Sequence, residues 1–416
     1  MINKLKSKSE FSSNAMTLMS GTVIAQALPL VITPILTRLY SPTDFGIFAI
    51  FVAIVGIFSV VATARYEQAI MLPDSHDEAI SLIALSVIMA SILSFTLALF
   101  IWIFFDFINS NTHIGYWLYG VPFGVLLVSI FNSLIAMNNR LALYKDIATS
   151  TVLKATVLAI SQLMLGFMSI GFAGLILGFL GSSIAANQKL LHNIRGYKLK
   201  NININIIKKL ANKYRNFPIF QAPHALLNTL VTYIPVYLFA PFFGTIAVGL
   251  YSLSNRVIFM PLSILANSNA KVYNQHITTN LNEQPQARYD FTVLLLKKFS
   301  LILIVPFVVF VVFAPDIFSF VFGKQWMVAG LYAQILSPWF FLNSLVSIIA
   351  YIPSMMNEQK KALKIAISHA IIISLAISFG IYLGDIKYAL ALFAIAQCTV
   401  LLYNLIWMLS LIRENK

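Results

Sequence analysis

The chain has 416 residues, of which 59% are hydrophobic and only 10% charged, and its formal net charge is +14. Together with a mean hydropathy of +0.84, this composition excludes an ordinary soluble globular protein and predicts an all-α integral membrane protein. A single cysteine, Cys398, excludes an intramolecular disulfide, and the six histidines show no metal-ligand spacing. We therefore expect neither a metal nor another cofactor.

Twelve apolar runs are long enough to cross about 30 Å of hydrocarbon as helices. The first follows a basic N-terminal segment with no cleavage site, and we interpret it as an uncleaved helix. The runs lie at residues 14–37, 44–64, 81–105, 116–137, 149–169, 171–189, 218–241, 245–268, 291–314, 331–354, 362–384 and 388–411.

Lysine and arginine residues are distributed unevenly between the two sides that twelve spans create. All but five of the 28 fall on the side that carries both termini; the exceptions are Arg38, Lys324 and Lys387 opposite, and Lys154 and Arg256 within spans. Because cytoplasmic loops retain such residues, both termini are predicted to be cytoplasmic. The positive charge is then a topology signal, and nucleic-acid binding is excluded because no soluble domain remains to carry it.

Charged residues gather at the inner end of the second span, in the segment ARYEQAIMLPDSHDEA at 64–79. Arg65 and Glu67 are two residues apart, so they cannot share a helix face and should point to different neighbours. Arg65 is either an anchor that reaches the membrane surface or part of an inward gate with Glu67. Glu67 is also a candidate partner of Arg140 or Lys154.

Glycines recur along the sixth span, in GFAGLILGFLG at 171–181. Gly171, Gly174, Gly178 and Gly181 fall on one side of this helix. Small residues in that pattern predict close packing against a neighbouring helix, and a nucleotide-binding loop is excluded because no strand precedes them.

The longest connection, residues 189–217, carries eight basic residues at the middle of the chain. It predicts a cytoplasmic linker between an N-terminal six-helix bundle, 1–188, and a C-terminal one, 218–416. A short repeat supports two pseudo-symmetric halves, because Gly46 and Gly249 open equivalent spans at an offset of 203 residues. Residues 204–210 either form an amphipathic helix on the anionic inner leaflet or only set topology by their charge.

Polar side chains within spans mark the faces that avoid lipid. The candidates for substrate binding are Gln26 in the first span, Gln221, His224, Asn228 and Thr232 on one face of the seventh, and Asn255 and Arg256 in the eighth. They either line a shared hydrated cavity or hydrogen-bond between helices. For Arg256 we favour the cavity, because a central arginine costs about 2.5–3.5 kcal/mol in insertion scales. We expect it to bind an anion.

Two segments carry a family resemblance. LTRLYSPTDFGIFAIF at 36–51 and ARYEQAIMLP at 64–73 bracket the second span, and they resemble the start of bacterial O-antigen flippases of the polysaccharide exporter family. The resemblance implies the fold of the multidrug, oligosaccharidyl-lipid and polysaccharide exporter superfamily, with alternating access. It implies a substrate, undecaprenyl-diphosphate-linked oligosaccharide, that moves from the cytoplasmic to the periplasmic leaflet of the bacterial inner membrane.

The resemblance also bears on site residues. The related lipid II flippases have a cationic cavity with arginines from the first, second and eighth helices. Arg256 matches the eighth-helix position, whereas Arg38 and Arg65 correspond loosely. Arg38, Arg65, Glu67 and Lys154 are candidates for gating or coupling, and His224 and Glu67 for coupling to an ion. Membrane lipids, a polysaccharide polymerase and a chain-length regulator are the expected partners.

Two alternatives remain open. A drug or cation antiporter of the same superfamily would need carboxylates inside the membrane, but the acidic residues here fall in loops or at span ends. A membrane polysaccharide polymerase would need a large catalytic loop, and the external connections are all short. We therefore expect a transporter and not an enzyme.

Overall fold

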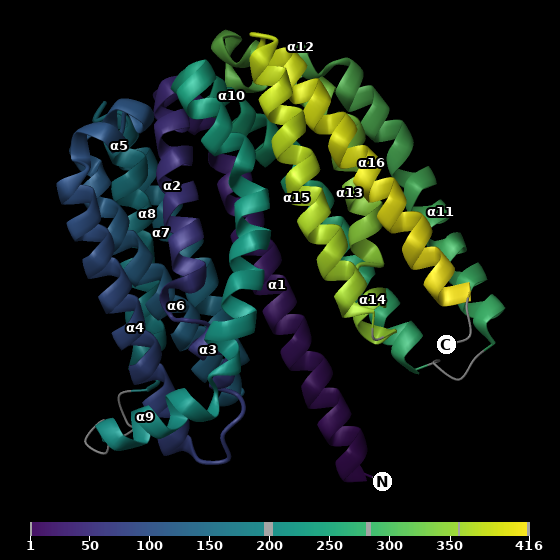
Figure 1. Ribbon diagram of the computed structural model, residues 1–416. Helices are drawn as coiled ribbons and strands as arrows, with labels where there is room; N and C mark the ends of the chain where they lie inside the picture. Colours follow the sequence, from purple (N-terminus) through teal and green to yellow (C-terminus); the bar gives the residue numbers. More distant parts are fainter. Residues whose placement is uncertain (1, 195–202, 280–283, 357, 414–416) are drawn as a thin grey trace. The chain divides into compact units, whose positions relative to one another are not determined.

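The computed structural model describes residues 2–194, 203–279, 284–356 and 358–413 (Figure 1). Every regular element among these residues is a helix, which confirms the predicted all-α class. The chain packs into two compact units, residues 1–241 and 242–416. Residues 218–241, placed with the second half by the sequence, pack within the first unit; the predicted division into two halves stays a prediction.

The first unit contains the following helices, ending with the first arm of a long helix, α10 (Ala222–Thr279): α1 (Ile2–Leu39), α2 (Pro42–Ala62), α3 (Tyr66–Ala69), α4 (His76–Ile103), α5 (Phe105–Thr112), η1 (Gly115–Tyr119), α6 (Gly120–Arg140), α7 (Tyr144–Phe167), α8 (Phe172–His192), α9 (Ile204–Lys213) and η3 (Phe217–Gln221). The second unit contains the other arm of α10, α11 (Pro285–Val312), α12 (Ala314–Phe322), η4 (Lys324–Trp326), α13 (Met327–Ile348), α14 (Ile352–Met355), α15 (Gln359–Tyr382) and α16 (Ile386–Arg413).

The number of membrane-spanning helices agrees with the sequence. Ten segments of the described chain are long and apolar enough to cross a membrane. One of them, Phe217–Thr278, is interrupted at Gly244, whose φ of 79° is non-helical. The 21-residue α8 has spanning length but is not one of the ten. With the two arms of α10 counted separately and α8 included, the described residues hold twelve helices of spanning length.

The start of α2 is fixed by a capping box. The Ser41 hydroxyl accepts a hydrogen bond from the Asp44 amide, and Asp44 Oδ2 accepts in return from the Ser41 amide at 2.8 Å. Pro42 occupies the first helical turn, where its missing N–H costs nothing. Asp44 Oδ1 also accepts from the Phe172 amide at 2.8 Å, which ties the start of α8 to the start of α2.

Glycines let α8 pack closely against α7 and the end of α1. A Cβ atom at Gly174 would lie 2.6 Å from the Tyr40 hydroxyl, and one at Gly178 would lie 2.6 Å from Cγ of Gln162. The predicted close packing is therefore confirmed at these two positions. Gly181 differs, because no described atom lies within 4 Å of its Cβ position.

Replacing Gly178 by valine is expected to destabilise the protein by about 1–3 kcal/mol, because the added carbon atoms push α7 and α8 apart. Thermal unfolding of the purified protein in detergent measures the effect. Gly181→Val is the matched control, since it makes the same change on the same helix in open space. Equal melting temperatures for the two variants would show that the helices do not depend on this contact.

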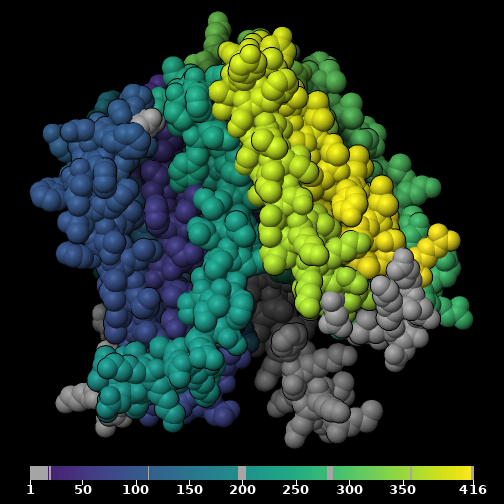
Figure 2. All heavy atoms as spheres, in the orientation of Figure 1, coloured from purple at the N-terminus to yellow at the C-terminus, as the bar shows by residue number. Residues whose placement is uncertain are grey.

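Helix α9 lies across one end of the first unit, beside α3 and the start of α4 (Figure 1). Ile207 and Leu210 are buried in a cluster with Tyr66 of α3, and the Tyr66 hydroxyl donates to the carbonyl of Ala211 at 3.1 Å. Figure 2 shows α9 as the outer layer at this end. A helix is therefore present at 204–210, as one of the two alternatives left open by the sequence requires. Ile207 and Leu210 pack on the protein, whereas Ile204 and Ile206 are 59% and 39% exposed.

Candidate functional site

The turn after α2 brings charged side chains together. The helix ends at Ala62, and the next residues include Ala64 and Arg65 with φ values of 50° and 62°. Both are in the left-handed region, which costs a residue with a side chain about 1–2 kcal/mol. The chain reverses there, and the short α3 begins at Tyr66. Strain of this kind persists only where the surrounding structure imposes it.

This reversal places Arg65 and Glu67 in contact, so the prediction that they point to different neighbours is wrong. Arg65 Nη1 lies 3.4 Å from Glu67 Oε1, and Glu67 Oε2 accepts a hydrogen bond from the Thr63 hydroxyl. The rule that separates residues i and i+2 applies to a continuous helix. Here the helix stops before Arg65, so the rule does not apply.

Neither predicted alternative partner reaches Glu67. Arg140 donates instead to the carbonyl oxygens of Ile70 at 3.2 Å and Asp74 at 3.3 Å. The Lys154 ammonium lies 4.4 Å from the centre of the Phe131 ring, a cation–π contact inside the first unit. Arg140 therefore holds the loop after α3, and Lys154 packs against aromatic rings of α6 and α8.

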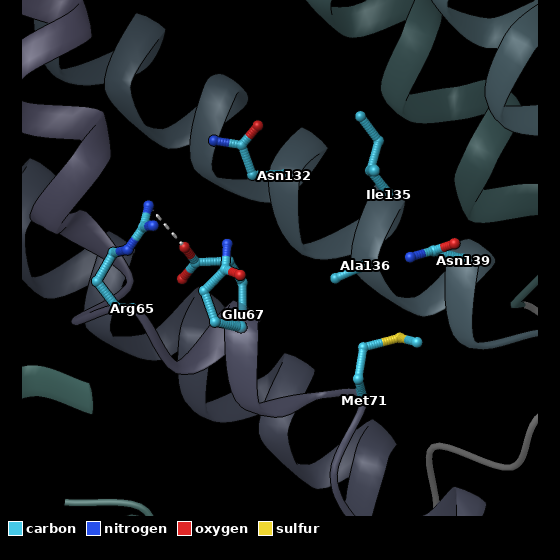
Figure 3. A pocket seen from close by; sticks show the side chains of 8 residues that line it. Arg65, Glu67, Met71, Asn132, Ile135, Ala136 and Asn139 are labelled. Atoms are coloured by element: carbon cyan, nitrogen blue, oxygen red, sulfur yellow. Dashed lines mark ion pairs between the residues drawn. The ribbon is translucent and has the colours of Figure 1, made fainter. Parts of the chain in front are cut away.

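A pocket of about 360 Å³ opens beside the ion pair (Figure 3). One wall comes from the turn and α3 and consists of Arg65, Glu67, Gln68 and Met71. The opposite wall comes from α6 and consists of Asn132, Ile135, Ala136 and Asn139. The last three follow Asn132 by 3, 4 and 7 residues, which places all four on one helix face.

The pocket is polar but carries no net formal charge. The Glu67 side chain is 5% exposed and the Arg65 side chain 25% exposed. Arg65 Nε is buried and makes no hydrogen bond with the described residues. Three carboxamides, from Gln68, Asn132 and Asn139, add donors and acceptors in equal measure. The site can therefore bind groups that both donate and accept.

The sequence reasoning missed Asn132 and Asn139. A signal was present, because Asn132 is an amide inside an apolar run and Asn139 follows it by seven residues, on the same helix face. The part of the wall that comes from the turn carries no comparable signal, since neither Ala64 nor Arg65 is a residue type that indicates left-handed backbone.

The polar face of the first arm of α10 is exposed. His224, Asn228 and Thr232 of α10 are exposed, and so is Gln221, the last residue of η3 just before it. On the opposite side of the arm, Leu230 and Tyr237 line an apolar pocket of about 370 Å³ with residues of α2 and α4. The arm therefore carries polar side chains on one side and contacts the first unit through Tyr237 on the other, while Leu227 and Leu230 remain 41% and 36% exposed. The predicted role of the polar face in substrate binding stays a prediction.

The remaining candidates do not line the pocket. Gln26 is half-buried in α1, and Arg38 is exposed at the end of the same helix. In the second unit, Arg256 is half-buried on α10 and interacts with its surroundings. The neighbouring Asn255 has a buried Oδ1 atom that accepts no hydrogen bond from the described residues. The positions of these residues do not show which of them contact a substrate, so their roles stay predictions.

The chain resembles solved transporters in fold. A lipid II flippase, MurJ, in an inward closed conformation is 14% identical with a TM-score of 0.75, covering 94% of this chain and 87% of that chain. An outward-facing multidrug resistance transporter of the MATE family is 12% identical with a TM-score of 0.61, covering 96% and 95%. A point mutant of the Vibrio cholerae MATE transporter VcmN is 14% identical with a TM-score of 0.56, covering 98% and 97%.

These likenesses establish the exporter-superfamily fold that the sequence predicted. No curated protein sequence is recognisably similar to the chain. A family model described as "Polysaccharide biosynthesis protein" matches residues 35–331, well over half of the sequence. The matched range contains α2, the Arg65–Glu67 turn and both arms of α10. The chain belongs to the polysaccharide biosynthesis protein family.

Proposed function

We propose that this protein is a flippase for undecaprenyl-diphosphate-linked oligosaccharide, an O-antigen repeat unit, which it moves from the cytoplasmic to the periplasmic leaflet by alternating access. The family match supports a role in polysaccharide biosynthesis, and the fold shared with a lipid II flippase supports transport of a lipid-linked glycan. The protein then acts as a transporter and catalyses no covalent step.

The observation that carries the proposal is the exposed polar face of α10. Polar side chains on a spanning helix are costly against hydrocarbon, so an exposed row of them fits a surface that meets water. Gln221, His224 and Asn228 offer amide and imidazole groups, which suit the hydroxyls of a hydrated sugar. A helix that were exposed only to lipid would not retain this row.

The diphosphate needs a cation inside the membrane. Arg256 is half-buried on a spanning helix, and its planar guanidinium matches phosphate oxygens with two parallel hydrogen bonds. Asn255 is the neighbouring residue, and its amide nitrogen is a donor suited to phosphate oxygens. We assign both residues to the binding of the substrate head group, and Gln26 of the first unit is a separate candidate for contact with the substrate.

The acidic residues favour this substrate over a cationic drug. Asp44 caps α2 and binds the Phe172 amide, and Glu67 is paired with Arg65. Among the described residues the remaining carboxylates lie in the connections between helices, near helix ends or, for Glu10, in the part of α1 that precedes its apolar segment Ser20–Leu39. A cation antiporter would need an available carboxylate within a span.

The proposed setting is the bacterial inner membrane, with both termini cytoplasmic, as the distribution of basic residues predicts. A polymerase and a chain-length regulator would receive the translocated unit on the periplasmic side. Arg38, Arg65, Glu67 and Lys154 remain candidates for gating or coupling.

Cells that lack the protein test the function. We expect them to lose surface polysaccharide and to accumulate complete lipid-linked units on the cytoplasmic face, and the gene for this chain to restore export. Units that reach the outer leaflet without polymerising would indicate a polymerase instead. Unchanged polysaccharide combined with greater sensitivity to cationic drugs would indicate an antiporter.

A further inference from the structure

The pocket beside Arg65 is poorly suited to a phosphate group. An anion that approached the Arg65 guanidinium would also approach the Glu67 carboxylate, which lies 3.4 Å from it. Two negative groups that share one cation in a partly buried site repel each other. The Thr63 hydroxyl holds Glu67 in this position, so the carboxylate cannot turn away without losing a second contact.

The same pocket is well suited to neutral hydroxyl groups. Each hydroxyl donates one hydrogen bond and accepts others, and each carboxamide offers both functions. Asn132 and Asn139 stand on one wall, and Gln68 and Glu67 on the other (Figure 3 labels all but Gln68). The Arg65 guanidinium, on a side chain that is 25% exposed, adds N–H donors. Opposed donors and acceptors on two walls would bind a ring that carries hydroxyls on several sides.

Size and apolar lining agree with this ligand. A volume of about 360 Å³ lies near the lower end of small-molecule sites, which suits roughly one or two sugar rings and not a whole oligosaccharide. Met71, Ile135 and Ala136 supply apolar surface between the polar groups. Carbon-bound hydrogens on the face of a sugar ring can pack against such side chains.

We infer that this pocket is a glycan subsite, which takes a neutral sugar of the lipid-linked oligosaccharide and leaves the diphosphate outside. The inference rests on the proposed function. Asn132 and Asn139 contact the sugar hydroxyls, and the Arg65–Glu67 pair excludes phosphate while it accepts and donates hydrogen bonds. The pocket thereby selects for the glycan, while a separate cation binds the anionic linkage.

Cysteine protection tests this assignment on the purified full chain in nanodiscs. Cys398 is the only cysteine, so Cys398→Ala gives a background into which Ala136→Cys places one thiol in the pocket. The probes are lipid-linked oligosaccharide extracted from cells and polyprenyl diphosphate without a glycan. We expect the glycan-bearing lipid to slow maleimide labelling of the pocket thiol at least about fivefold, and the bare diphosphate to leave the rate unchanged.

Thr149→Cys in the same background is the control. Thr149 is exposed on α7 and lines a different pocket, so neither probe should alter its labelling. In the Ala136→Cys background, Asn132→Ala should raise the concentration of glycan-bearing lipid needed for half-maximal protection by roughly two- to tenfold, because one or two hydrogen bonds to the sugar are lost. Glu67→Gln should allow the bare diphosphate to protect, since the charge of Arg65 is then unopposed.

Each contrary result overturns the inference. Equal protection by both lipids with Glu67 intact would make the pocket a phosphate site, and protection by neither would mean that it binds no part of the substrate. Protection at Thr149→Cys as well would show that the lipid shields the whole surface. Labelling of the purified protein does not depend on transport in cells. If deletion cells accumulate lipid-linked units but neither lipid protects the thiol of the purified variant, only the glycan subsite is contradicted and the proposed flippase function stands.

Discussion

Replacing Arg256 by alanine is expected to abolish export of surface polysaccharide while the protein remains in the membrane. Two charge-assisted hydrogen bonds to the diphosphate would be lost, which corresponds to about 3 kcal/mol or roughly a hundredfold in binding. Arg256→Lys should retain part of the export, because lysine keeps the charge but not the planar fork. Surface polysaccharide is measured in deletion cells that express each variant, with protein in the membrane fraction quantified in parallel.

The control is Lys271→Ala, which removes an exposed cation from the same helix. Cells that express it should export polysaccharide normally, because we assign this exposed lysine no contact with the substrate. Normal export by Arg256→Ala would refute the anion site. If Arg256→Ala and Arg256→Lys were both absent from the membrane fraction, Arg256 would be required for folding or insertion of the protein.

Replacing Glu67 by alanine is expected to lower the free energy of unfolding by about 2 kcal/mol. Removing one member of a buried ion pair typically costs about 3–5 kcal/mol, and the 25% exposure of the Arg65 side chain reduces this cost through hydration. The double variant Arg65→Ala/Glu67→Ala should recover much of the loss, because no unpaired charge remains. Thermal unfolding in detergent provides the comparison.

An exposed ion pair of the same unit serves as the reference. Lys213 and Glu78 lie 3.7 Å apart with 52% and 39% of their side chains exposed. Because exposed pairs contribute about 0–1 kcal/mol, Lys213→Ala should shift the melting temperature far less than Glu67→Ala. Equal shifts would mean that the Arg65–Glu67 pair is effectively hydrated.

Most of the fold could be predicted because hydrocarbon imposes a simple requirement on sequence. Each spanning helix needs about 20 apolar residues, so the helices emerge from hydropathy alone, including the two arms that Gly244 separates. What α9 contacts was harder to predict. Ile207 and Leu210 form an apolar face, but a face of that kind suits a lipid surface and a protein surface equally well.

The candidate site was predictable only in part, because it depends on one local backbone event. Arg65 and Glu67 were identified as unusual from their charge, but their contact follows from left-handed backbone at Ala64 and Arg65. The pocket also needs Asn132 to lie opposite them, which depends on how α6 packs against the turn. The spacing of residues within either segment does not reveal that packing. Arg256 could be singled out for the opposite reason, since the cost of its charge in a span is local.

Asp44 lies in one of the two segments that carry the family resemblance. This one carboxylate receives the amide of Ser41 and the amide of Phe172, so part of the segment at 36–51 acts as a joint between two helices. This contact between two helices does not depend on which substrate the protein binds. A resemblance in such a segment therefore reports on helix packing and not on substrate. Under the proposed function, attempts to change the glycan that is bound should begin at Asn132 and Asn139.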